Sequence, residues 1–204
     1  MTDYIQDLAT IRGIMEKRTK FISLSGLSGI LAGIYALIGA YLAYRTIYFS
    51  DNTIYSAYRN GIWSPEIIKL LVIGFSVLIL ASLTGLILSM RKAKKLGQNF
   101  WNPSALRMIS SFLVPLTAGG IFVMILIWRG QATYVAPALL LFYGVAVYTA
   151  GNFTFSDVKT LGILEIILGL LAALYPGKGL LFWTIGFGGL HILYGAIMYF
   201  KYER

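Results

Sequence analysis

The chain of 204 residues contains no cysteine, only one histidine and few charged residues. Without cysteine, disulfide bonds, thiolate metal ligands, iron–sulfur clusters and cysteine nucleophiles are all excluded. Charged residues make up 12% of the chain, whereas soluble domains usually carry about 25%. A water-soluble fold of this length cannot bury a chain that is 58% hydrophobic. The composition therefore predicts a polytopic membrane protein.

Familiar catalytic motifs are also missing. The sequence has no HExxH zinc motif, no Gly-x-Ser-x-Gly elbow and no phosphate-binding P-loop. One histidine with one intramembrane glutamate supplies too few ligands for a catalytic zinc built from a single chain. The sequence therefore predicts no metal site, requires no cofactor, and favours a protein that is not an enzyme.

Long apolar runs are abundant, and a membrane-spanning helix needs about 20 such residues. The sequence predicts an all-α fold in which a six-helix transmembrane domain occupies residues 21–200. An amphipathic helix over residues 1–20 precedes it on the cytoplasmic interface, and residues 201–204 form a cytoplasmic tail. The six predicted spans are Phe21–Tyr44, Ile67–Met90, Ala105–Trp128, Tyr134–Asn152, Thr160–Tyr175 and Gly179–Phe200.

Lysine and arginine are distributed unevenly between the predicted loops, and the net charge is +9. If the N-terminus lies inside, the cytoplasmic side carries Arg91, Lys92 and most other basic residues, whereas the outer side carries few. This bias predicts that both termini are cytoplasmic. Because the basic residues form short clusters beside the membrane, nucleic acid is not an expected partner. The compact, loop-poor design favours a bacterial cytoplasmic (inner) membrane.

A weak internal repeat links several spans. Tyr143-Gly144 followed by Tyr148 matches Tyr194-Gly195 followed by Tyr199, and Thr84-Gly85 followed by Ser89 is similar. Gly29-Ile30-Leu31 in the first span also resembles Gly162-Ile163-Leu164 in the fifth. Three helical hairpins inserted in the same orientation would produce this pattern. Chance is the alternative, since glycine and tyrosine are common in this chain.

Two ionisable residues lie inside apolar runs, Glu165 in the fifth span and His191 in the sixth. Both fall within stripes of small residues spaced three or four apart, and such stripes pack against other helices. If the two spans fold about Gly177, Glu165 lies opposite Gly189, and His191 lies about 3 Å further in. We therefore expect the pair to meet in the cytoplasmic half of the membrane, directly or through one water molecule.

Intramembrane ionisable groups usually have a function, because burying them is costly. A carboxyl group beside an imidazole can hold or transfer a proton, or bind a cation. The sequence thus predicts a ligand or proton site at Glu165 and His191, with Tyr143, Tyr194 and Ser111 on a cavity wall. The alternative is a structural pair that only joins two helices.

Three functions stay open at this point. The favoured one is ligand binding or proton- or cation-linked transport. The second is a membrane-embedded regulatory or sensory subunit that acts through a cytoplasmic partner. The third is an intramembrane enzyme that modifies lipid. The lipid bilayer is the expected surrounding, and the sequence leaves open a small-molecule or cation ligand and a second copy of the chain as partners.

Overall fold

The computed structural model describes residues 24–48 and 64–203, and within these ranges the chain is entirely helical apart from short connections. The predicted interfacial helix at residues 1–20 lies outside the described residues. Long helices are α2 (Gly26–Tyr48), α4 (Pro65–Lys95), α5 (Pro103–Trp128), α6 (Val135–Ala150) and α7 (Ser156–Leu174). The last hairpin arm consists of α8 (Gly179–Trp183), the π-helical turn η3 (Thr184–Leu190) and α9 (His191–Tyr202). Short 3₁₀ turns, η1 (Ala132–Tyr134) and η2 (Gly151–Phe153), flank α6.

Five of these helical stretches are long and apolar enough to cross a membrane. They agree with five of the six predicted spans and indicate a membrane protein. The remaining helix, α7, has 19 residues and is therefore about 28 Å long, close to the thickness of a bilayer core. It differs from the other five in charge, because its 19 residues include Asp157, Lys159 and Glu165.

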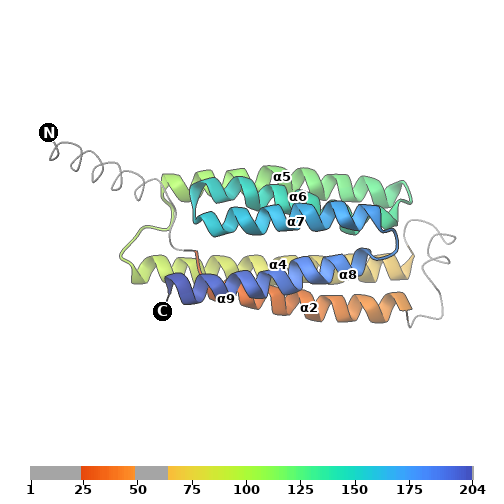
Figure 1. Ribbon diagram of the computed structural model, residues 1–204, viewed down its shortest axis with the longest axis horizontal. Coiled ribbons are helices and arrows are strands. Elements are labelled where there is room, and N and C mark those ends of the chain that lie inside the picture. The colour runs from red at the N-terminus through yellow and green to blue at the C-terminus, as the bar shows by residue number, and fades with distance from the viewer. Residues whose placement is uncertain (1–23, 49–63, 204) are drawn as a thin grey trace.

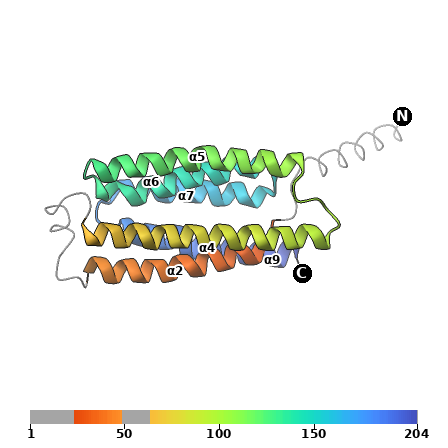
Figure 2. The same cartoon turned by 180° about the vertical axis from the view of Figure 1, so that it is seen from behind.

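The long helices lie in two layers of three (Figures 1 and 2). One layer contains α5, α6 and α7, with α6 packed between its neighbours. The other contains α2, α4 and the continuous rod of α8, η3 and α9, with α2 packed against both partners. The layers meet where α7 and α6 contact α8, η3 and α9. The interface between the layers therefore brings the fifth and sixth predicted spans together.

Local sequence signals explain where two of the helices begin. The Ser64 hydroxyl accepts a hydrogen bond from the Ile67 amide at 3.3 Å and caps α4. The Asn102 side chain likewise caps α5 by accepting from the Ala105 amide at 2.8 Å. Each cap is followed by proline, which lacks the amide hydrogen that a first helical residue leaves unpaired.

Glycine allows two helix pairs to approach closely. A Cβ atom on Gly26 or Gly195 would collide with the backbone of the opposite helix at the crossing of α2 and α9. Between α6 and α7, a Cβ on Gly144 would lie 2.8 Å from the Gly162 carbonyl oxygen, and one on Gly162 would lie 2.8 Å from the Gly144 oxygen. These contacts bear out the expectation that the small-residue stripes are helix–helix interfaces.

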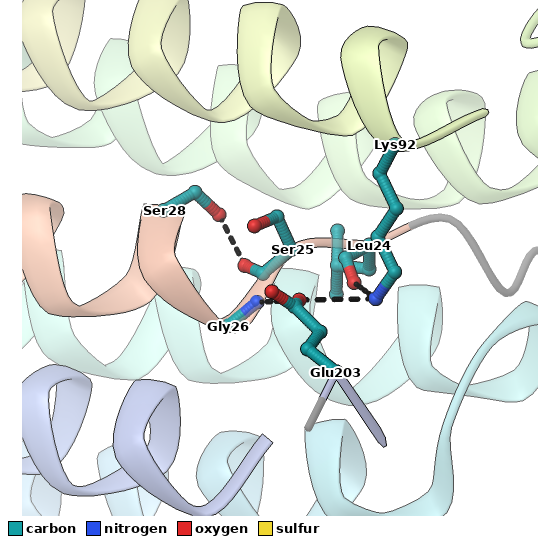
Figure 3. Close-up of polar contacts among 6 residues, drawn as sticks. All are labelled: Leu24, Ser25, Gly26, Ser28, Lys92 and Glu203. Atoms are coloured by element: carbon teal, nitrogen blue, oxygen red, sulfur yellow. Dashed lines mark hydrogen bonds and ion pairs between the residues drawn. The ribbon is translucent and has the colours of Figure 1, made fainter. Parts of the chain in front are cut away.

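A polar cluster joins three segments at the end of the bundle that holds the C-terminus (Figure 3). The Lys92 ammonium group donates to the Leu24 carbonyl oxygen at 2.8 Å and to Glu203 Oε1 at 3.0 Å. The same Glu203 oxygen accepts from the Gly26 amide at 2.6 Å. Glu203 therefore caps the start of α2, where the helix dipole favours a negative charge. We call this end of the bundle the inner end.

Candidate functional site

Glu165 lies on the face of α7 that points into the bundle. Its side chain is completely buried, and Gly162, Gly169 and Ala172 on the same face are buried too. Because the small neighbours let other helices come close, the carboxyl group is covered by protein. The predicted position of Glu165 within a small-residue stripe is confirmed.

His191 begins α9 and lies directly across the layer interface from Glu165. Its Nδ1 atom is 3.4 Å from Glu165 Oε1, and 8% of its side chain is exposed. The expected meeting of the two side chains is therefore confirmed, without an intervening residue. His191 also contacts Tyr143 of α6, whose hydroxyl oxygen lies 2.6 Å from Nε2. One imidazole thus connects α9 with both α6 and α7.

The hydrogen bonds assign the protons of the neutral imidazole. Nδ1 lies 3.0 Å from the Gly186 carbonyl oxygen, which can only accept, so Nδ1 carries the hydrogen. In the neutral ring Nε2 then has a free lone pair and accepts from the Tyr143 hydroxyl. The hydrogen on Nδ1 points to the Gly186 carbonyl, with Glu165 Oε1 as the second acceptor nearby. A small rotation of the ring would exchange one acceptor for the other.

The Glu165 carboxyl group packs against the backbone of Gly186. A Cβ atom on Gly186 would lie 2.5 Å from Glu165 Oε2 and 2.6 Å from Leu140 Cδ2. Within the described residues neither carboxyl oxygen has a hydrogen-bond partner. Burying such a group without partners costs free energy. The Glu165 carboxyl group can therefore take up a proton or accept a new hydrogen bond.

Aromatic rings surround the imidazole. Phe187 lies nearly parallel to His191, with ring centroids 5.9 Å apart, and its centroid is 4.9 Å from that of Tyr143. Trp183 lies one helical turn before Phe187, and the centroids of these two rings are 5.2 Å apart. These rings exclude water from one side of the imidazole and hold its plane in position.

The three weaker candidates from the sequence differ in position. Tyr143 belongs to the site through its bond to His191. Tyr194 packs beside Val147, Val158 and Leu161, and its buried hydroxyl has no hydrogen-bond partner in the described part of the chain. Ser111 is not brought to the pair by any hydrogen bond among the described residues. Its carbonyl oxygen accepts from Thr149 at 2.9 Å, which joins α5 to α6.

The residue of the sixth span that faces the carboxyl group differs from the one predicted from the sequence. The expected neighbour was Gly189, but a Cβ on Gly189 would meet nothing within 4 Å, whereas Gly186 touches the carboxyl group. The π-helical turn at Thr184–Leu190 contributes to this difference, because counting along a regular α-helix does not allow for its wider turns. Gly186 and Phe187 were missed for this reason. The dense glycines of the run Gly186-Phe187-Gly188-Gly189 were the signal that an irregular turn was present.

A second polar group connects the two layers at the inner end. Asp157 at the start of α7 accepts from Lys201 Nζ at 3.0 Å and from the Tyr202 hydroxyl at 2.8 Å. Burial by itself would raise the pKa of Asp157, but the hydrogen bonds from Lys201 and Tyr202 outweigh it and hold the pKa below its usual value. The Tyr202 ring also packs on Phe155, with centroids 4.2 Å apart. This end of the bundle is thus held by charge and by stacking.

A surface groove among the described residues does not include Glu165. It runs between the outer ends of α2 and α4 and is lined by Tyr41, Leu42, Arg45, Thr46, Ile68, Lys69, Val72 and Ile73. None of the predicted site residues lines it. Glu165 and His191 are joined by no third aspartate, glutamate or histidine that would make a metal-ligand cluster within the described residues.

No protein-family model, curated protein or solved structure matches this chain.

Proposed function

We propose that the chain is a proton-linked membrane transporter in which Glu165 and His191 form the proton site. The observation that carries this proposal is the pairing of a fully buried carboxyl group with a buried imidazole 3.4 Å away on another helix. Intramembrane acid–imidazole pairs of this kind are typical of proton relays in pumps and transporters. The tight packing against Gly186 favours a proton over a larger ligand at this position.

The pair offers two electrically neutral arrangements. In one, a protonated Glu165 faces a neutral His191; in the other, a carboxylate faces an imidazolium. From the imidazolium, the proton on Nδ1 can pass to Glu165 Oε1 if Nδ1 turns from the Gly186 carbonyl toward it, and the neutral imidazole then keeps its other hydrogen on Nε2. Because the contacts of His191 reach both layers, a change in its hydrogen bonds would alter how α7 and α9 pack. Proton binding could thereby be coupled to a movement of the two layers.

We propose that α7 also spans the membrane, which gives six spans with both termini in the cytoplasm. Several observations support this topology. The inner end carries Lys92 and Lys201, in agreement with the positive-inside rule. The length of α7 suits a bilayer, and a charged residue at its centre, Glu165, has its partner within the bundle.

The proposed internal repeat gains support from the glycine contacts. Gly162 faces the Gly144 carbonyl and the Tyr148 amide, and Gly26 faces the Gly195 carbonyl and the Tyr199 amide. Helices α6 and α7 thus pack with the same register as α9 and α2. The equivalent of Gly162 is Gly26 in this register, three residues before the Gly29 suggested by the sequence. The third copy gains no such support, because Gly85 has no close neighbour.

A charge-displacement experiment tests the proton site. The purified protein is reconstituted in proteoliposomes, adsorbed on a solid-supported membrane and exposed to a rapid drop in pH. We expect a transient current from the wild type and none from Glu165→Gln, which keeps the size of the side chain but binds no proton. A current of equal size from both proteins would overturn the proposal.

The same measurement separates a transporter from a regulatory subunit. A transporter should keep its current when residues 2–15 are deleted, because the site lies wholly within the helical bundle. A regulator that acts on a cytoplasmic partner through the N-terminal segment should lose its regulatory effect when residues 2–15 are deleted. It should keep that effect with Glu165→Gln.

A further inference from the structure

The surface groove between α2 and α4 takes no part in the proposed proton site. The two helices run side by side and antiparallel, so the end of α2 and the start of α4 lie together at the outer end of the bundle (Figures 1 and 2). Both helices are long and apolar enough to cross a membrane. The groove has a volume of about 620 Å³, which is within the usual range for a site that holds a small molecule.

Two positively charged side chains line this groove at a similar level. Arg45 lies three residues before Tyr48, the last residue of α2. Lys69 lies four residues after Pro65, the first residue of α4. At about 1.5 Å per residue, the two positions are about 4.5 Å and about 6 Å from the outer ends of their helices. Both are therefore near the edge of the hydrocarbon core, from which long basic side chains reach the lipid head groups.

Apolar side chains line the deeper part of the groove. Leu42 lies about one turn deeper than Arg45, and Val72 and Ile73 lie about one turn deeper than Lys69. None of the described residues that line the groove is aspartate or glutamate. The groove thus combines positive charge near the membrane surface with an apolar floor toward the centre of the bilayer.

This combination favours one kind of occupant. A second copy of the chain, placed symmetrically on the groove, would bring its own Arg45 and Lys69 toward the same two charges, and like charges repel. A purely apolar molecule would contact only the floor. An anionic phospholipid complements both parts, because its phosphate group can bind arginine and lysine while an acyl chain covers the apolar side chains.

We propose that this groove binds one anionic phospholipid, with the phosphate at Arg45 and Lys69 and an acyl chain along Leu42, Val72 and Ile73. Basic pockets between membrane helices are a known type of site for anionic head groups. The proposal goes beyond the proposed function and is independent of it, since Glu165 and His191 do not line the groove. A lipid bound here joins α2 to α4 at the outer end of the bundle.

Native mass spectrometry of the purified protein in detergent tests this site. Dioleoyl-phosphatidylglycerol, dioleoyl-phosphatidylcholine and glycerol 3-phosphate are titrated separately. We expect one molecule of phosphatidylglycerol to bind more tightly than phosphatidylcholine, and glycerol 3-phosphate, which has the charge but no acyl chain, to bind more weakly than either. Lys69→Gln should weaken the binding of phosphatidylglycerol by about fivefold, and Arg45→Gln/Lys69→Gln should weaken it by about 25-fold.

The double variant Arg129→Gln/Lys178→Gln is the matched control. Both residues are exposed at the outer end of the bundle, but neither lines the groove. The control therefore removes the same charge from another part of the same end, and it should bind phosphatidylglycerol as tightly as the wild type. All four substitutions replace exposed side chains, so we expect the variants to fold, which circular dichroism checks.

Several results would overturn the proposal and leave the proton site untouched. Equal affinity for the two phospholipids, or an equal loss in both double variants, would show only a general association of lipid with the protein. Glycerol 3-phosphate that binds as tightly as phosphatidylglycerol would show that the apolar floor is not used. A dimer that is present in the wild type and absent in Arg45→Gln/Lys69→Gln would assign the groove to a second copy of the chain.

Discussion

The side chain of Glu165 fits against Gly186 because the glycine has no side chain of its own. The carboxyl group occupies the space that a side chain at position 186 would need, and the Gly186 carbonyl competes with it for the hydrogen on His191 Nδ1. The identity of one small residue therefore controls both the position of the acid and the hydrogen bonding of the base. The sequence showed the acid and the base, but counting along a regular α-helix does not bring Gly186 to Glu165, and only the dense glycines around position 186 indicated an irregular turn.

Gly186→Ala should damage the site directly. The added methyl group would lie within 2.6 Å of both Glu165 Oε2 and Leu140 Cδ2, and we expect a loss of about 1–3 kcal/mol in stability from overpacking. Thermal unfolding in detergent measures this loss. Gly189→Ala is the matched control, because a Cβ there would meet nothing within 4 Å. Equal melting temperatures for the two variants would contradict the described packing.

The helices and their approximate limits were the features best predicted from the sequence. The predicted ranges of five spans agree with helices in the structure, because hydrophobic length determines them. Their ends differ by a few residues: α4 continues to Lys95, five residues beyond the predicted Met90. Basic residues near a helix C-terminus interact favourably with the helix dipole, so this continuation is stabilised. The small-residue stripes predicted which helix faces pack against other helices. They did not predict which helices are neighbours.

Gly195→Ala tests the close crossing of α2 and α9. Its Cβ would collide with the Ile30 amide nitrogen and lie 2.7 Å from the Gly26 carbonyl oxygen, so the backbones must separate. We expect a destabilisation of about 1–3 kcal/mol, measured as a lower thermal unfolding temperature. Gly85→Ala in α4 serves as control, because its Cβ would have no neighbour within 4 Å. The crossing would be refuted if Gly195→Ala were as stable as this control.

At the scale of the whole molecule, two groups of polar contacts join the layers within residues 24–48 and 64–203. The Tyr143–His191–Glu165 contacts connect them inside, and the Asp157–Lys201–Tyr202 group connects them at the inner end. The sequence could not predict the second group, because residues 44 and 45 positions apart in the chain meet only once the layers have assembled.

The contact at the inner end should make stability depend on pH. The pKa of Asp157 is lower in the folded protein than its usual value, so folding favours the ionised form. The stabilisation is therefore fully present above the ordinary aspartate pKa of about 3.9 and is lost as the pH falls through the lower pKa of the folded state. We expect the melting temperature of the wild type to fall more steeply below about pH 4 than that of Asp157→Asn. Parallel curves would show that the contact does not stabilise the fold.

The most direct measurement uses the fact that His191 is the only histidine in the sequence. Protein labelled with ¹⁵N-histidine, carrying no histidine tag, gives ring-nitrogen NMR signals from this residue alone. At high pH we expect two distinct signals, from a protonated Nδ1 and an unprotonated Nε2, as the bonds to Gly186 and Tyr143 require. As the pH falls these signals should titrate, and Glu165→Gln should change the titration. The opposite tautomer, or a titration that Glu165→Gln leaves unchanged, would contradict a proton site shared by the two residues.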